Sequence, residues 1–179
     1  MKLQQTVSAA AYASGTPVLT NAVLIAATVL TGMAAGAIAL YAHTIMPGLK
    51  KTDDRTFVGA FQSMDRAIIN PWFMSAFFGA LVLIGAAAVL HLGAGRRPVL
   101  PWLVAAFILY LVAVLITMAV NVPLNDALKA AGDPSRIDVA QARAAFNESK
   151  WAAWNYVRTI TTLGAFVILA AILAFRATR

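Results

Sequence analysis

VLTNAVLIAATVLTGMAAGAIALY, residues 18–41, contains no side chain that is charged at neutral pH. At about 1.5 Å of rise per residue, a helix of roughly 20 residues crosses the ~30 Å hydrocarbon core of a bilayer. The same absence of charge recurs in three further windows, residues 67–95, 98–125 and 159–175. The sequence therefore predicts an all-α integral membrane protein, an up-down bundle of four helices.

The predicted membrane spans are about 18–41, 70–92, 99–120 and 159–175, and they leave too few of the 179 residues for a separate soluble module. We therefore expect a single domain, residues 1–179. The window after the first 17 residues is too long for the core of a signal peptide, so we expect an uncleaved first helix. Within it, Gly32 and Gly36 have the four-residue spacing that lets another helix approach closely.

Proline is expected to end the first and third spans, because it lacks the amide that continues the helical hydrogen-bond ladder. Pro47 follows the first span and Pro123 the third. After each comes an amphipathic segment outside the membrane. The first is a short helix capped by Thr52 or Asp53 and expected to lie against the mouth of the bundle. The second is a helical pattern that starts at Ser135 and continues unbroken into the fourth span.

Composition excludes several classes of function. The net charge of +7 comes from 14 basic and 7 acidic residues, which flank the spans and form no patch for nucleic acid. The chain has no cysteine, and His43 and His91 fall at opposite ends of the predicted spans, so neither a thiolate site nor a two-histidine metal site can form. No acid or base lies within a span to carry protons or ions across. We expect membrane lipid as a partner, no nucleic acid, no metal and no other cofactor; a homo-oligomer is compatible with the sequence.

Two features of the charge distribution point to opposite orientations. The amino terminus, the Arg96-Arg97 turn and the carboxyl terminus share a side that holds five cations and no acid. The other side holds nine cations and seven acids on longer segments. The positive-inside rule gives most weight to short basic segments, which favours a cell (inner) membrane protein with both termini in the cytoplasm; the count of cations favours the reverse.

Polar residues gather where the first and third predicted helices end and where the second and fourth begin. Antiparallel topology brings these positions to one membrane face, and a charge that faced lipid there would cost several kcal/mol. The candidates for a catalytic role are His43, Asn121, Asn125, Asn155 and Arg158. The candidates for contact with a bound molecule are Asp65, Asn70, Trp72, Trp151 and Trp154. We expect these residues to form a polar mouth.

The same residues have structural interpretations. Asn70 is placed as a helix cap, and Arg158 could extend to lipid phosphates. Asn121 and Asn125 could bind backbone groups that a nearby proline leaves free. The tryptophans fit an interfacial belt of aromatic anchors. The joint placement of these groups on one face favours a functional site, because capping alone would distribute amides over both faces.

Several stretches resemble the anthrone oxygenase-like membrane family, over about Gly32 to Thr162. The most specific are Asn121-Val-Pro-Leu-Asn125 and Trp151-Ala-Ala-Trp-Asn-Tyr-Val-Arg-Thr159, in this order between spans. Residues 46–49, 53–58, 61–62 and 67–73 also match, whereas His43 departs from the small or hydroxylated residues usual there. The resemblance implies a monooxygenase that converts an anthrone-type tricyclic polyketide to the quinone with molecular oxygen, without metal or flavin.

The residue set is compatible with such chemistry on an anthrone-like or other lipophilic aromatic substrate. Loss of one proton from the methylene group of an anthrone gives an electron-rich anion that can reduce oxygen directly. The protein would supply a base, His43 or Asp65, and donors for the anionic oxygen from Arg158 and the asparagines. The alternative is a non-enzymatic small membrane protein whose polar mouth binds lipid or a quinone, or docks a partner protein.

Overall fold

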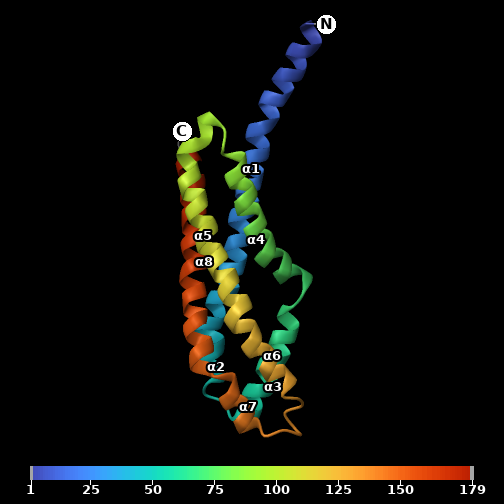
Figure 1. The fold of residues 1–179 in the computed structure, drawn as a ribbon, viewed down its shortest axis with the longest axis vertical. Coiled ribbons are helices and arrows are strands. Elements are labelled where there is room, and N and C mark those ends of the chain that lie inside the picture. Colours follow the sequence, from blue (N-terminus) through green and yellow to red (C-terminus); the bar gives the residue numbers. More distant parts are fainter. Residues whose placement is uncertain (1, 178–179) are drawn as a thin grey trace.

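The computed structural model describes residues 2–177, with side chains described for 18–93 and 97–176 (Figure 1). All regular structure in this part of the chain is helical. Four long helical columns run side by side in alternating directions, and short helices cover one end of the bundle (Figure 1). Each column contains a stretch that is long and apolar enough to span a bilayer: Val18–Leu49, Pro71–Leu90, Arg97–Ala130 and Val139–Arg176. The expected all-α membrane bundle is confirmed.

The first and third columns are each built from consecutive helices. The first column contains α1 (Lys2–Leu40), the π-helical turn η1 (Tyr41–Ile45) and α2 (Met46–Leu49). The third contains a 3-10 turn η2 (Ala94–Val99), α5 (Leu100–Ile116), the π-helical turn η3 (Thr117–Asn121) and α6 (Val122–Ala130). The amino-terminal part of α1 projects beyond the bundle at the end where the chain also terminates (Figure 1).

The prediction that proline ends the first and third helices is wrong. Before Pro47, the amide of Met46 donates to the carbonyl of Tyr41, five residues back, and before Pro123 the amide of Val122 donates to Thr117 in the same way. A π turn adds one residue, which moves the proline ring away from the carbonyl it would strike in a regular α-helix. Both helices therefore continue through their prolines.

Two expected caps start the next helices. The Asp53 side chain caps α3 (Asp54–Ile68), accepting at 3.0 Å from the amide of Thr56. Hydrogen bonds from the hydroxyl and amide of Thr56 hold the pKa of Asp53 below its usual range. Asn70 caps α4 (Pro71–Leu90) by accepting at 3.0 Å from the amide of Phe73, so the chain turns sharply between α3 and α4.

The helical pattern expected to run unbroken from Ser135 into the fourth span is interrupted. Helix α7 (Val139–Phe146) begins after Asp138 and ends at Asn147, which has a left-handed backbone with φ 54°. The Asn147 side chain then accepts at 3.1 Å from the amide of Lys150 in the first turn of α8 (Glu148–Ala177). One asparagine thus stops α7 and starts α8, a double role that hydrophobic periodicity does not reveal.

The bundle core is made of small and aliphatic residues contributed by all four columns. Ala27, Ala80, Ala106 and Ala165 are fully buried, which allows the helices to approach closely. Tyr110 is also fully buried, and its hydroxyl donates at 2.9 Å to the carbonyl of Phe77, linking α5 to α4. The Tyr110 hydroxyl therefore binds backbone rather than lipid.

A second core lies under the short helices at one end. It is largely aromatic, with Phe57, Phe61 and Phe146 in mutual ring contact. Arg143 of α7 crosses it, pairing with Asp54 of α3 at 3.0 Å, and also with Glu148 of α8 at 2.6 Å. Helices α3, α6 and α7 thus form an aromatic cap over the bundle (Figure 1).

The two glycines of the first span differ in their surroundings. A Cβ atom on Gly32 would lie 2.8 Å from Cε2 of Phe166 on α8, whereas one on Gly36 meets nothing within 4 Å. We predict that Gly32→Ala destabilises the purified protein by about 1 kcal/mol relative to Gly36→Ala, because the Phe166 ring must move. Thermal unfolding in detergent measures the difference. Equal melting midpoints for the two variants would contradict the close packing of α1 against α8.

Candidate functional site

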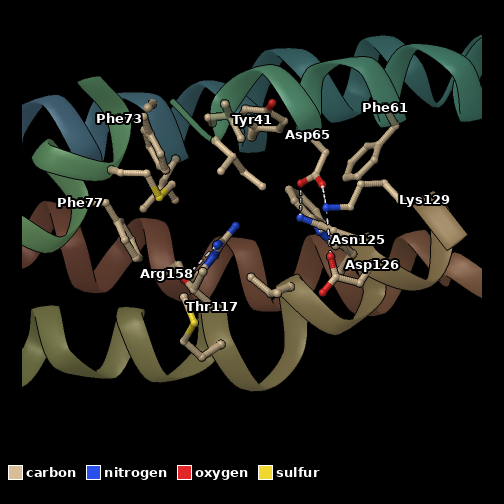
Figure 2. A pocket seen from close by; sticks show the side chains of 18 of the residues that line it. Tyr41, Phe61, Asp65, Phe73, Phe77, Thr117, Asn125, Asp126, Lys129 and Arg158 are labelled. Atoms are coloured by element: carbon tan, nitrogen blue, oxygen red, sulfur yellow. Dashed lines mark hydrogen bonds and ion pairs between the residues drawn. The ribbon is translucent and has the colours of Figure 1, made fainter. Parts of the chain in front are cut away.

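A cavity of about 220 Å³ lies between the bundle core and the aromatic cap. All four columns and α3 line it, so residues far apart in sequence share one space (Figure 2). Its walls are mostly apolar, with Ile38 on α1, and Phe73 and Phe77 on α4. The charged groups of the cavity are confined to the opposite side and to the end under the cap (Figure 2).

Arg158 of α8 brings a guanidinium group into this apolar space and is 8% exposed. Its Nη2 donates at 2.6 Å to Oδ1 of Asn155, and its Nη1 donates at 3.0 Å to the hydroxyl of Thr117 on η3. The guanidinium also lies 5.6 Å from the ring centroid of Trp151. Its Nε is buried and has no hydrogen-bond partner among the described residues. The neighbours that bind this cation are thus neutral, which leaves it able to stabilise an anion.

A chain of hydrogen bonds and ion pairs crosses the cavity end under the cap. Trp151 donates from Nε1 to Asn125 at 2.7 Å, and Asn125 donates from Nδ2 to Asp65 at 2.6 Å. Asp65 pairs with Lys129 at 2.7 Å, and Lys129 pairs with Asp126 at 3.0 Å. We call these five residues the polar ladder (Figure 2). It joins α8, α6 and α3, and it places a buried carboxylate in the cavity wall.

The amino-terminal part of α8 forms hydrogen bonds with both π-helical turns. Tyr156 donates at 3.2 Å to the carbonyl of Ala42 in η1, which loses its helical donor because Pro47 has no amide. Asn121, the last residue of η3, donates at 3.3 Å to the carbonyl of Trp151. The π turns therefore give α8 the partners that fix its position beside the cavity.

The structure brings only part of the expected polar mouth together. Arg158, Asn125, Asp65 and Trp151 all line the cavity. Asn121 and Asn155 are buried and do not line the cavity. Asn121 donates to a backbone carbonyl, and Asn155 binds a backbone carbonyl and Arg158.

Four other candidates lie outside the cavity. His43 is exposed and its Nδ1 is 2.6 Å from the hydroxyl of its neighbour Thr44. Asn70 caps α4, as its structural interpretation expects. Trp72 is 83% exposed, and Trp154 is 39% exposed. Their positions suit contact with lipid at the membrane interface.

Sequence reasoning missed four polar residues of the cavity: Tyr41, Thr117, Asp126 and Lys129. For two of them, helical spacing from a predicted site residue indicates that the side chain faces the cavity. Thr117 precedes Asn121 by four residues, and Lys129 follows Asn125 by four, so each pair shares a helix face. Tyr41 follows Ile38 by three residues and shares its face, whereas His43 lies two residues further and points away.

A wider hollow of about 930 Å³ lies beyond Asn155, between α7 and the end of the first column. Three of its four charged groups are bound together, since Arg143 pairs with Asp54 and Glu148, and the fourth, Lys50, is exposed. We therefore place the candidate site in the smaller cavity, which contains the unpaired guanidinium. Among the described residues, no three histidine, aspartate or glutamate side chains gather in a way that could hold a metal ion.

Asn125 is the central link of the polar ladder. We predict that Asn125→Leu costs about 1–3 kcal/mol, because it leaves Nε1 of Trp151 and an oxygen of Asp65 without partners in a partly buried place. Asn21→Leu is the matched control, since Asn21 is exposed and accepts one long hydrogen bond, 3.3 Å, from Arg176. Thermal unfolding in detergent compares them. A midpoint for Asn125→Leu equal to that of the control would show that the ladder contributes no stability.

Comparison with known proteins places these residues in a family. The family model described as anthrone oxygenase matches residues 72–168, more than half of the chain. The match includes Arg158, Thr117 and three members of the polar ladder on α6, and it begins after Asp65. No curated protein and no solved structure matches the chain. The chain belongs to the anthrone oxygenase family.

Proposed function

We propose that the cavity is the active site of an oxygenase that oxidises a lipophilic aromatic ketone of the anthrone type with molecular oxygen. One observation carries the proposal: a buried guanidinium whose Nε has no partner among the described residues lines a mostly apolar cavity within a membrane bundle. Burying a charge within a membrane bundle costs free energy, and charged residues in such positions are therefore typical of functional sites. The family assignment points to the same class of reaction.

The proposed reaction requires no electron donor other than the substrate. A base removes one proton from the methylene carbon, and the resulting anion transfers one electron to O2, giving a carbon radical and superoxide. The two combine to form a carbon–oxygen bond, and protonation of the peroxide gives a hydroperoxide. Loss of water from the hydroperoxide forms the second carbonyl group. In total, a CH2 group and O2 become a C=O group and water.

The residues divide this work between the two sides of the cavity. Arg158 faces the place where the ketone oxygen becomes anionic, and its donors can stabilise the charge. Asp65 is proposed as the base because its carboxylate lies in the same wall, held by Asn125 and Lys129. The cavity volume, about 220 Å³, is below the roughly 300–1,000 Å³ of pockets for drug-sized ligands, which suits a compact ring system.

We further propose that the protein lies in the cell membrane with both termini in the cytoplasm. The short Arg96-Arg97 turn and the carboxyl-terminal arginines are cationic and contain no acid, which supports this orientation. The cavity and the cap would then face the opposite side of the membrane from the termini.

A carboxyl-terminal reporter tests the orientation. We predict that a fluorescent protein that matures only in the cytoplasm is bright when it is fused after Arg179, whereas a phosphatase that folds only outside the cytoplasm is inactive there. The reverse pair of results would invert the proposed orientation.

The central test is oxidation of anthrone by purified protein in nanodiscs, followed by oxygen uptake and by the appearance of anthraquinone. We predict that Arg158→Ala lowers turnover by about 100-fold to 1,000-fold, since it removes the donors for the developing anion. Arg158→Lys should retain part of the activity because it keeps the charge but not the paired donors.

Arg97→Ala is the matched control, because Arg97 is exposed and lies in η2, which connects α4 to α5 and does not line the cavity. Each variant must first show the melting midpoint and elution volume of a folded protein. Folded Arg158→Ala with undiminished oxidation would refute the role of Arg158. Wild-type protein that binds anthrone or a quinone without consuming oxygen would instead assign the cavity to the non-enzymatic binding function.

A further inference from the structure

We infer that the ligand of this cavity enters from the hydrocarbon phase of the membrane, through a lateral opening between α4 and η3 that Ile69, Phe78 and Met118 form. The identity of the ligand as an anthrone-type ketone rests on the proposed function. The route itself rests on the shape and exposure of the cavity wall, and it can be tested without any reaction.

The three residues of the lateral opening belong both to the cavity and to the outer surface. Ile69, Phe78 and Met118 line the cavity, yet their exposed fractions are 60%, 41% and 45%. A lining residue of a closed cavity would be buried, as Phe77 is at 2%. Phe78 and Met118 lie within membrane-spanning stretches, so their exposed surface faces lipid. The apolar side of the cavity is therefore continuous with the hydrocarbon phase.

The end of the cavity that faces water is crossed by bonded groups. The polar ladder spans it with contacts of 2.6–3.0 Å between charged or amide groups. Helix α3 is held over this end by Gln62, whose side-chain amide donates to the carbonyls of Leu128 at 2.8 Å and Gly132 at 3.0 Å. The side chain of Asp126 is 60% exposed, so water reaches this end. A ligand from water would nevertheless have to pass between bonded charged groups, whereas a ligand from lipid meets only flexible apolar side chains.

The lateral opening selects the class of ligand. A molecule that reaches it must dissolve in the bilayer, so it carries no fixed charge when it enters. Its polar atom meets Arg158 only after the apolar body has passed Phe78 and Met118. Entry through the lateral opening therefore restricts the substrate to a flat, uncharged compound that dissolves in the membrane and ionises only inside the cavity.

The absence of native cysteine allows a direct test of the route. Ile38→Cys puts a single thiol on the cavity wall opposite the opening, at a position that is 4% exposed. Monobromobimane is a flat, neutral reagent whose bromide the thiol displaces, and its trimethylammonium analogue has the same reactive group with a fixed charge. Protein in nanodiscs exposes both membrane faces to both reagents, and mass spectrometry measures the fraction modified.

We expect the neutral reagent to modify Ile38→Cys at least about tenfold faster than the charged reagent, because a fixed charge is costly in hydrocarbon. Adding Met118→Trp should slow the neutral reagent by a similar factor by filling the opening. Leu115→Trp is the matched control, since Leu115 is 57% exposed on the same column but does not line the cavity. Reaction after denaturation verifies that each thiol is intact, and melting midpoints verify that each variant is folded.

Three results would overturn the inference: equal rates for the two reagents, no slowing by Met118→Trp, or no labelling of the folded protein by either reagent. These results do not depend on turnover. Lateral labelling without anthrone oxidation would refute the proposed function alone, and oxidation without lateral labelling would refute the route alone.

Discussion

Backbone carbonyl groups that lose their helical donors inside a membrane need other partners, and this constraint organises the site. Pro47 and Pro123 each follow a π-helical turn, and α8 supplies groups that bind both turns. Tyr156 donates to the carbonyl of Ala42 in η1, while Asn121 at the end of η3 donates back to α8. The turn before Pro47 therefore offers α8 a backbone carbonyl, and the turn before Pro123 offers it the Asn121 amide; both contacts help to fix α8 and with it the position of the cavity's cation.

The cavity exists because the protein has two separate cores. The bundle core is filled by alanines and aliphatic residues, while the aromatic cap packs its phenylalanines against one another and against Trp151. The cap is fastened by Arg143 and Gln62, so it covers the bundle mouth without entering it. Space remains where the two cores meet, and the residues that face it include Ile38 and Phe77 from one core and Phe61 from the other.

The sequence predicted the membrane bundle well, because charge-free windows of sufficient length have few structural solutions. It also predicted a cap at Thr52 or Asp53, of which Asp53 is the one that forms, and the cap at Asn70; both depend on local hydrogen bonds. It failed at the prolines, where a π turn replaces a helix end, and at Asn147, whose left-handed conformation divides α7 from α8. These local conformations depend on contacts with other parts of the fold, and the spacing of apolar residues along one helix carries no information about those contacts.

The candidate site was predictable only in part for a related reason. Antiparallel topology is enough to bring Arg158 and Asn125 to one end of the bundle, and both line the cavity. The pairing of Asp65 with Lys129 depends on how α3 docks on α6, which no local pattern specifies. Depth in the membrane alone suggests that His43 belongs to the site, but depth does not determine direction, and the His43 side chain is exposed.

The charges around the cavity balance as a group but not locally. Arg158 and Lys129 are matched by Asp65 and Asp126, yet Lys129 contacts both carboxylates while Arg158 contacts neither. The guanidinium side of the cavity is therefore positive and the polar ladder is negative (Figure 2). If a neutral ligand gives its proton to Asp65, the negative charge moves from the ladder to the ligand oxygen near Arg158. The total charge of the site does not change: the transfer exchanges the attraction between Asp65 and Lys129 for one between the ligand anion and Arg158, and no additional charge enters the low-dielectric surroundings.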